Sequence, residues 1–583
     1  MSGLALFRFL LVGSLSLSTI IFSVPQQEVR PSQPQAQAKT PPQEIPSMVL
    51  RVTTHLVIVD TIVTDRSGKA VRDLKAEDFK LYENGQPQEI RVFSFQQTLP
   101  ETSAKTAKRI LPENVYTNVP ETNAHSGPPT VLLIDALNTP TADRVYLHQQ
   151  LVKYLQGSGP QQNFAIYLLG NRLQMLQDFT TDPELLKAAI KKFSLEPSAV
   201  KNEHPEDGID DALERDLGDI MGGLPPSMIR ALRQFEDQKI IAQTDMRVTI
   251  TLDALRRIGR YLAGYPGRKN LIWVSAAFPT AVTSAVDGTL ASNYSQAMRE
   301  TANALTDAQV AIYPVDPRGL VNTSTTDITL SGRSPTGGAR RGPDAADDVA
   351  RRNATQENAH DSMKEMAAET GGRAFYNRND IDNAIASSIE DGSAYYTLGY
   401  YPTNKNWDDK FHKIEVKLER KGLQVRSRKG YFATDPEKVA RLDEKTARQE
   451  FVNFLTPGSP KATSLPFVVH VNPPNQATSE VIVDFSVEPH AIAFKRGDDN
   501  TEHAEMDFIV RAFDSKGKSA GNETQNLKAD FKPETFAQIM TIGLRFRETI
   551  KLPPGKYLLE MGVRDARSNL MGTVSAFVEV PQS

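Results

Sequence analysis

The stretch PPTVLLIDALNT, residues 128–139, decides how this sequence can fold. Residues 131–134 are all apolar, and they lead directly into Asp135 and a short run that ends in small polar side chains. A continuous apolar run of this length is typical of a strand that is buried on both faces, as in a parallel sheet. Open α/β sheets bind their ligands at the carboxyl ends of such strands, so Asp135 is the first candidate for a functional residue.

Further apolar runs and helical patterns alternate after this strand. The pattern predicts strands at 164–169, 173–179, 270–275 and 310–315, and helices at 141–157, 183–193, 248–263, 291–306, 357–370 and 381–390. This alternation predicts a three-layer, Rossmann-like α/β domain over residues 128–392. Two polar stretches, near 196–245 and 321–352, are expected to be insertions in that domain. Asp316 also follows a strand on the expected ligand face. For this residue, a role in forming the turn is favoured over a role as a ligand.

The flanking sequence predicts β structure. Residues 47–97 carry β-branched runs and two turn signals, and we expect the strands at 394–433 to complete the same β domain. A polar linker is expected at 98–127 and a helix at 435–456. The pattern of short apolar strands over residues 464–583 predicts an immunoglobulin-like β-sandwich of six or seven strands. Those strands are predicted at 467–469, 481–487, 506–513, 541–552, 555–563 and 573–580.

The amino terminus resembles a secretory signal. Arg8 precedes an apolar stretch at 9–24, which is shorter than the roughly 20 residues that span a membrane. We therefore expect a signal peptide over residues 1–25, with an uncleaved membrane anchor as the alternative. Residues 26–46 are rich in Pro and Gln and are expected to be a disordered tether. The predicted location is the periplasm, the outer surface or the medium, with no membrane span after the signal is removed.

Composition excludes several function classes. The chain of 583 residues is long enough for several domains and has a formal charge of −4, which argues against a nucleic-acid binder. It has no cysteine, which excludes disulfides, thiolate metal ligands and a cysteine nucleophile. The nine histidines form no zinc-binding motif. No nucleophile–base pair, paired-acid motif or cofactor loop is visible, so we expect a protein that is not an enzyme.

Several short stretches make the sequence similar to a known family. The order of strands and helices over 128–392 resembles a von Willebrand factor type A (VWFA) domain, and the wider pattern resembles the VWFA-related proteins of Acidobacteria. The stretches that carry the resemblance are residues 63–85, 178–182, 270–275, 369–375, 395–400, 429–432 and 552–557. The resemblance implies an α/β domain that recognises a partner, and it covers most of the chain.

The same resemblance implies a metal-ion-dependent site. Type A domains hold Mg²⁺ or Mn²⁺ with an Asp-x-Ser-x-Ser motif, a Thr from a second loop and an Asp from a third. Here Asp135 matches the first Asp, Thr139 the second hydroxyl, and Thr180 the second-loop Thr, while Asn138 offers an amide oxygen. The sequence departs from the pattern at Leu137, and Ser-Ala-Ala-Phe at 275–278 offers no third-loop Asp. The alternative is that no metal binds and that Asp135 and Thr139 cap a helix or bond the loop backbone.

The sequence therefore predicts an exported protein of the binding or adhesion type. A type A domain with a degenerate metal-ion-dependent site would recognise a protein or a cell-surface ligand. Two alternatives stay open: a structural scaffold of an envelope or secretion assembly without a metal site, and a hydrolase that acts through unrecognised carboxylates.

Overall fold

The computed structural model of the chain describes residues 56–97, 111–120, 127–156, 163–195, 225–276, 278, 280–283, 289–319, 343–404, 408–433, 444–472, 474, 480–497 and 499–582. The expected signal peptide (1–25) and tether (26–46) lie outside these residues. So do the larger parts of the two expected insertions. Within the described residues the chain is multidomain and combines one α/β unit with several antiparallel sheets.

The stretch at 130–135 forms β6, the middle strand of a five-stranded sheet with the order β12-β9-β6-β7-β8. The first four of these strands run parallel and β8 runs antiparallel to β7. All residues of β6, β7 and β9 are buried, as an apolar run covered on both faces requires. The other bounds are β7 Phe164–Leu169, β8 Leu173–Thr180, β9 Lys269–Val274 and β12 Val310–Val315.

Helices cover both faces of this sheet. Val131 and Leu133 of β6 pack in one core with α4 (Pro226–Leu262), α5 (Ser295–Asp307) and α6 (Pro343–Thr370). Leu132 and Ile134 point to the other core, whose helices are α1 (Thr141–Gln156), α2 (Pro183–Leu195) and α7 (Ile381–Ser393). The alternation of side chains along β6 thus produces the three layers.

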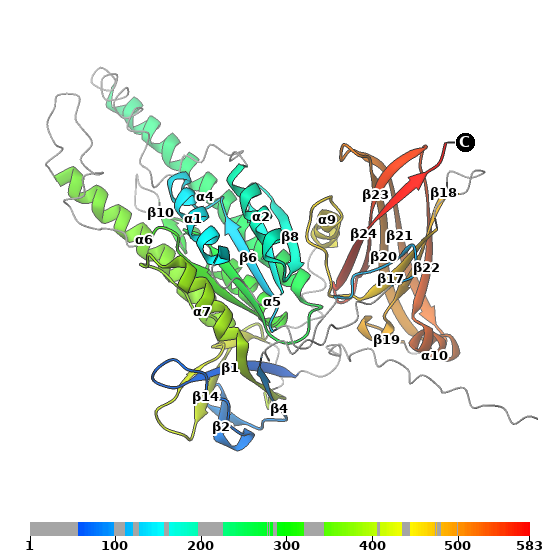
Figure 1. The fold of residues 1–583 in the computed structure, drawn as a ribbon, viewed down its shortest axis with the longest axis horizontal. Coiled ribbons are helices and arrows are strands. Elements are labelled where there is room, and N and C mark those ends of the chain that lie inside the picture. Colours follow the sequence, from blue (N-terminus) through cyan, green and yellow to red (C-terminus); the bar gives the residue numbers. More distant parts are fainter. Residues whose placement is uncertain are drawn as a thin grey trace, which may run out of the picture. The chain divides into compact units, whose positions relative to one another are not determined.

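Two helices begin earlier than the sequence predicts. α4 begins at Pro226, with Pro at its first position, and α6 begins at Pro343. Around the start of α4, the side chains whose burial is described between residues 225 and 231 are exposed, so the apolar periodicity that reveals a helix is absent there. Figure 1 shows both helices continuing past the central sheet. A short hairpin, β10 (Ala281–Thr283) with β11 (Leu290–Asn293), is a further element that the sequence did not reveal.

The β domain is built from two segments that lie far apart in sequence. One sheet has the order β15-β1-β13-β4, and the other has the order β16-β14-β2-β3. Both contribute to one core that contains Val59, Phe79, Tyr396 and Ile414. The bounds are β1 Val57–Thr64, η1 Ala76–Asp78, β2 Phe79–Glu83, β3 Gln86–Gln88, β4 Val92–Gln97, β13 Ala394–Tyr400, β14 Phe411–Leu418, β15 Gln424–Arg426 and β16 Gly430–Phe432. Strands from 394–433 therefore pair with strands from 47–97.

The carboxyl-terminal part holds two antiparallel sheets around one core. One sheet has the order β22-β18-β17-β5, and the other β19-β20-β23-β24, with β21 paired to β20. The bounds are β17 Phe467–Asn472, β18 Glu480–Val487, η4 Pro489–Ala491, β19 Lys495–Arg496, β20 Glu502–Phe513, β21 Ser519–Phe531, α10 Pro533–Ile542, β22 Leu544–Lys551, β23 Gly555–Asp565 and β24 Met571–Val580. Helix α9 (Glu444–Phe454) buries Phe451 and Phe454 in a smaller core with Ile509 of β20.

Three details of this part differ from the sequence-based expectation. The segment expected to be a linker at 98–127 contains β5 (Val115–Thr117), which pairs with β17. The strand expected at 541–552 starts at Leu544, because α10 occupies the residues before it. β21 was not expected, since its side chains are mostly polar and its order comes from pairing along the whole length of β20.

Candidate functional site

Asp135 ends β6 and is fully buried. Its Oδ1 accepts hydrogen bonds from the backbone N–H groups of Leu137 (3.1 Å) and Asn138 (2.9 Å). Its Oδ2 accepts three more, from Asn138 Nδ2 (2.8 Å), Trp273 Nε1 (3.0 Å) and Ser275 Oγ (2.8 Å). Burial raises the pKa of Asp135 above its usual value, while the bonds from Asn138, Ser275 and Trp273 act in the opposite direction.

Asn138 and Thr139 lie in the loop that follows β6, and both are buried. Asn138 Nδ2 also donates to Thr251 Oγ1 of α4 at 2.7 Å, which ties this loop to the helix layer. The Thr139 hydroxyl has no hydrogen-bond partner among the described residues. Arg144 of α1 donates from Nε to the Thr139 carbonyl at 2.9 Å and also bonds the Ala136 carbonyl. The loop is therefore held by hydrogen bonds on both sides.

Thr180 lies at the opposite edge of the sheet. Asp135 pairs with Leu169 at the end of β7, whereas Thr180 pairs with Phe164 at the start of β7. The five residue-to-residue steps from Phe164 to Leu169 correspond to about 16 Å at ~3.3 Å per residue. The structure thus brings Asp135, Asn138 and Thr139 together and keeps Thr180 away from them. Thr180 Oγ1 instead accepts a bond from the backbone N–H of Asp182, beside the start of α2.

The geometry around Asp135 does not fit a magnesium or manganese ion. A carboxylate offers about four lone-pair positions, and five donors already converge on this one. The indole N–H of Trp273 and the amide NH₂ of Asn138 point their positive ends at the place where a cation would bind. Hard cations need about six oxygen ligands. Across the described residues, no group of three or more His, Asp or Glu side chains is placed to hold a metal ion.

A second carboxylate lies at the same edge, after β12. Asp316 is buried, and its Oδ2 lies 2.8 Å from Nε2 of the buried His360 of α6. Arg318 donates to Asp316 from Nε (3.0 Å) and Nη2 (2.8 Å), and Nη2 also reaches the Ala276 carbonyl. Burial would raise the pKa of Asp316, but the bonds from His360 and Arg318 outweigh it and hold that pKa below its usual value. The His360 ring stacks on Tyr376 at 4.6 Å.

The sequence reveals Asp316 but not its partners. His360 comes from a helix 44 residues further along the chain, and a lone histidine in an amphipathic helix carries no signal of its partner. Histidine beside a carboxylate is a common catalytic pair. Within the described residues, however, no serine or threonine hydroxyl forms a hydrogen bond with His360. The part of the chain that the structure describes therefore places no serine or threonine nucleophile beside this pair.

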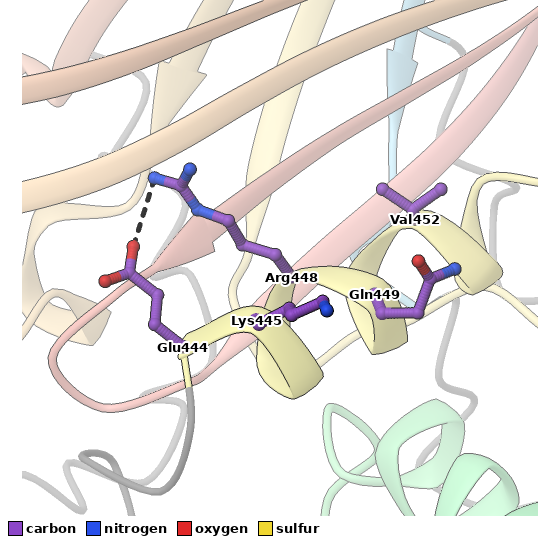
Figure 2. Close-up of a pocket in the computed structure, with 5 residues that line it drawn as sticks. All are labelled: Glu444, Lys445, Arg448, Gln449 and Val452. Carbon is purple, nitrogen blue, oxygen red and sulfur yellow. Dashed lines mark ion pairs between the residues drawn. The ribbon is translucent and has the colours of Figure 1, made fainter.

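A shallow hollow runs along one face of α9, lined by Glu444, Lys445, Arg448, Gln449 and Val452 (Figure 2). Arg448 forms an ion pair with Glu444 at 3.1 Å and also contacts Asp507 of β20 at 3.2 Å. Ligand sites usually combine apolar walls with a few convergent polar groups. This hollow is lined by a single helix and mainly by charged or amide side chains, so its chemistry points to no ligand.

No family model and no curated protein matches the sequence. Solved structures give weak similarities to bacterial proteins. An aerotolerance-related membrane protein from Bacteroides fragilis has 12% identity and a TM-score of 0.23, covering 45% of this chain and 99% of that chain. BatB from Bacteroides thetaiotaomicron, a conserved hypothetical protein, has 11% identity and a TM-score of 0.21, covering 45% and 98%. TM-scores this low establish neither a shared fold nor a shared function.

Within the described residues, the helices include none that is both long enough and apolar enough to span a membrane.

Proposed function

We propose that this chain is an exported binding protein that recognises a partner protein at the carboxyl edge of its α/β domain, without a metal ion. The export part rests on the signal-like residues 1–25. The resemblance to type A domains supports recognition at this edge. The closed hydrogen-bond network around Asp135 supports a rigid platform, because its groups are engaged inside the protein and are not free for catalysis or for a cation.

The exposed apolar face of α4 is the observation that carries this proposal. Met228, Phe235 and Met246 are 57%, 67% and 61% exposed. They are spaced by 7 and 11 residues, close to two and three helical turns, so they lie on one side of the helix. α4 touches the site through Thr251, and its first half continues past the sheet edge (Figure 1). Large apolar side chains aligned on an exposed face are typical of protein-binding surfaces.

A photo-crosslinking amino acid at Phe235 tests this recognition. We expect it to label one partner in envelope extract, to keep doing so with chelator present, and to lose the label when excess unmodified protein competes. The matched control carries the crosslinker at Val145 of α1, which is 62% exposed on the opposite helix layer. Equal labelling from both positions, or labelling that requires a divalent ion, would contradict the proposal.

A titration with Mg²⁺ and Mn²⁺ tests the metal-independent part. We expect no rise in the melting temperature of the unmodified protein. Asp135→Ala should lower the free energy of unfolding by about 3–5 kcal/mol, because Asn138, Trp273 and Ser275 lose a buried acceptor. Ser275→Ala removes one donor and should cost about 1 kcal/mol. A metal-dependent rise that disappears in Asp135→Ala would show that the site does bind a cation.

A scaffold role is the second candidate, because hydrogen bonds join the α/β domain to the segment before β17. Thr463 Oγ1 accepts from the Gly264 backbone N–H at 2.8 Å and donates to the Tyr261 carbonyl at 2.6 Å. Arg260 of α4 forms an ion pair with Glu450 of α9 at 2.8 Å. A scaffold without a partner at α4 would give no competable label from Phe235, so the crosslinking experiment separates the two roles.

A further inference from the structure

Two buried arginines lie where the amino edge of the α/β sheet meets the β domain. Arg268 precedes β9 and is 3% exposed, and Arg428 precedes β16 and is 8% exposed. Within the described residues, neither guanidinium forms an ion pair with a carboxylate. Arginine is almost never fully buried without such a partner, because moving a charge out of water is costly. The pair therefore needs a counter-charge.

The two side chains line a small cavity of about 20 Å³. Asp60 of β1 and Thr370 at the end of α6 line it as well, with Thr306 and Gln309 beside β12. The Nε atoms of both arginines are buried and have no hydrogen-bond partner among the described residues. Arg268 uses Nη2 for the Tyr313 hydroxyl (3.1 Å) and the Gly371 carbonyl (2.8 Å), which fixes the guanidinium in place.

Gly371 allows this close approach. Its φ of +78° is a conformation that favours glycine. A Cβ there would lie 3.0 Å from the Arg428 backbone nitrogen and 3.7 Å from Nη1 of Arg268. The end of α6 thus brings the two arginines to the same cavity.

Charge balance indicates what the cavity binds. Two guanidinium groups face one carboxylate, that of Asp60, whose Oδ1 accepts from Thr397 Oγ1 at 2.8 Å. Asp307 also attracts Arg428, but it is exposed and its field is screened by water. Burial lowers the pKa of Arg428, which reflects the cost of that buried charge. Of the two positive charges on Arg268 and Arg428, only one is balanced by the buried carboxylate of Asp60.

We propose that this cavity binds one monatomic anion of the halide class, which in cells is chloride. A single negative charge balances the excess, and both free Nε–H groups become donors to it. About 10–15 Å³ is the space that one water-sized sphere requires, so a cavity of about 20 Å³ has the size of a single small ion. The ion would join β1 of the β domain to the start of β9 in the α/β domain.

Thermal unfolding of the full chain tests the anion site. Sodium chloride replaces sodium gluconate at constant ionic strength, so that general screening is unchanged. We expect a saturable rise of about 2–4 °C in the melting temperature of the unmodified protein. Arg428→Gln should remove the response. The matched control is Arg426→Gln, whose arginine is already paired with Asp391 at 2.7 Å and which should keep the full response.

Two further measurements do not depend on whether Arg428→Gln folds. Asp60→Asn removes the competing carboxylate and should lower the chloride concentration at half-saturation by about 10-fold. Crystals of the unmodified protein soaked in bromide should show an anomalous peak between Arg268 and Arg428. Identical melting temperatures in chloride and gluconate, or a cavity that holds only water in saturating bromide, would overturn the proposal.

Discussion

Two buried asparagines show how much the side-chain environment matters at a single residue. Asn138 donates to Asp135 and to Thr251. Asn270, at the start of β9, is equally buried, yet neither its Oδ1 nor its Nδ2 has a hydrogen-bond partner among the described residues. An unpaired buried amide costs free energy that an apolar side chain of similar shape does not. The two positions should therefore respond oppositely to the same substitution.

Asn270→Leu should raise the free energy of unfolding by about 1–2 kcal/mol, because it removes two unpaired polar atoms. Asn138→Leu should lower it by about 2–4 kcal/mol, because Asp135 and Thr251 both lose a partner. Chemical denaturation of both variants measures the difference. Destabilisation in Asn270→Leu would mean that Asn270 is paired in solution.

At the scale of single residues, the sequence predicts the positions of the buried carboxylates better than it predicts their hydrogen-bond partners. Asp135 is the last residue of β6 and Asp316 directly follows β12, and the sequence predicts both at the same sheet edge. The donors that saturate Asp135 include Trp273 and Ser275, which are 138 and 140 residues away along the chain. No local pattern encodes such contacts. Thr180 was assigned by a motif match, and its distance from Asp135 follows from β8 running antiparallel, which the motif does not report.

At the scale of elements, apolar runs identified the strands of the central sheet because those strands are buried on both faces. β6, β7, β9 and β12 all lie where such runs occur. Elements that bury little apolar surface gave no comparable signal, as with β21 and the first half of α4. Their order comes from a partner strand or from helix propagation. A multidomain chain that mixes α/β and β structure, the coarse expectation from the sequence, is confirmed.

The end of α6 contributes a pH-dependent term to stability. Burial raises the pKa of Glu369 to about 7, assisted by Glu365 and opposed by Arg299 and Lys429. The unfolded chain should titrate near 4.5, so between these values the folded state binds more protons than the unfolded state. The contribution of Glu369 to stability is therefore fully present below pH 4.5, and it is lost as the pH rises through about 7.

Glu369→Gln should therefore be about as stable as the unmodified protein near pH 4.5 and more stable at pH 8. The expected gain is about 1–3 kcal/mol, discounted because the side chain is only partly buried. Denaturation at a series of pH values measures it. Glu357→Gln, at an exposed position of the same helix, is the matched control because it removes the same negative charge from α6. A parallel shift of both variants would exclude Glu369 as the titrating group.

At the scale of the whole molecule, the β domain depends on two chain segments that the α/β domain separates. β1 pairs with β13 and β2 pairs with β14, and their apolar side chains share one core. Neither segment alone contains that core, because its residues come from both segments. A single segment of this size therefore buries too little surface to fold unaided.

A fragment of residues 48–97 should accordingly be unfolded by circular dichroism and give a collapsed amide NMR spectrum. Joining 48–97 to 394–433 through a short Gly/Ser linker should restore a cooperative unfolding transition, since the paired strands are then present. A cooperative transition in the isolated 48–97 fragment would contradict the joint core.

The division of the β domain into two segments also delays its folding during translation. Gln97 ends β4 and Ala394 begins β13, so about 300 residues are translated between the first strands and their partners. At roughly 5–20 residues per second, this takes about 15–60 s. Throughout that time the segments that later form β1, β2 and β4 lack their partners β13 and β14 and stay unfolded, with their apolar side chains open to other chains. The nascent chain must therefore be kept apart from its neighbours, and a holding chaperone that binds the first hundred residues should raise its yield.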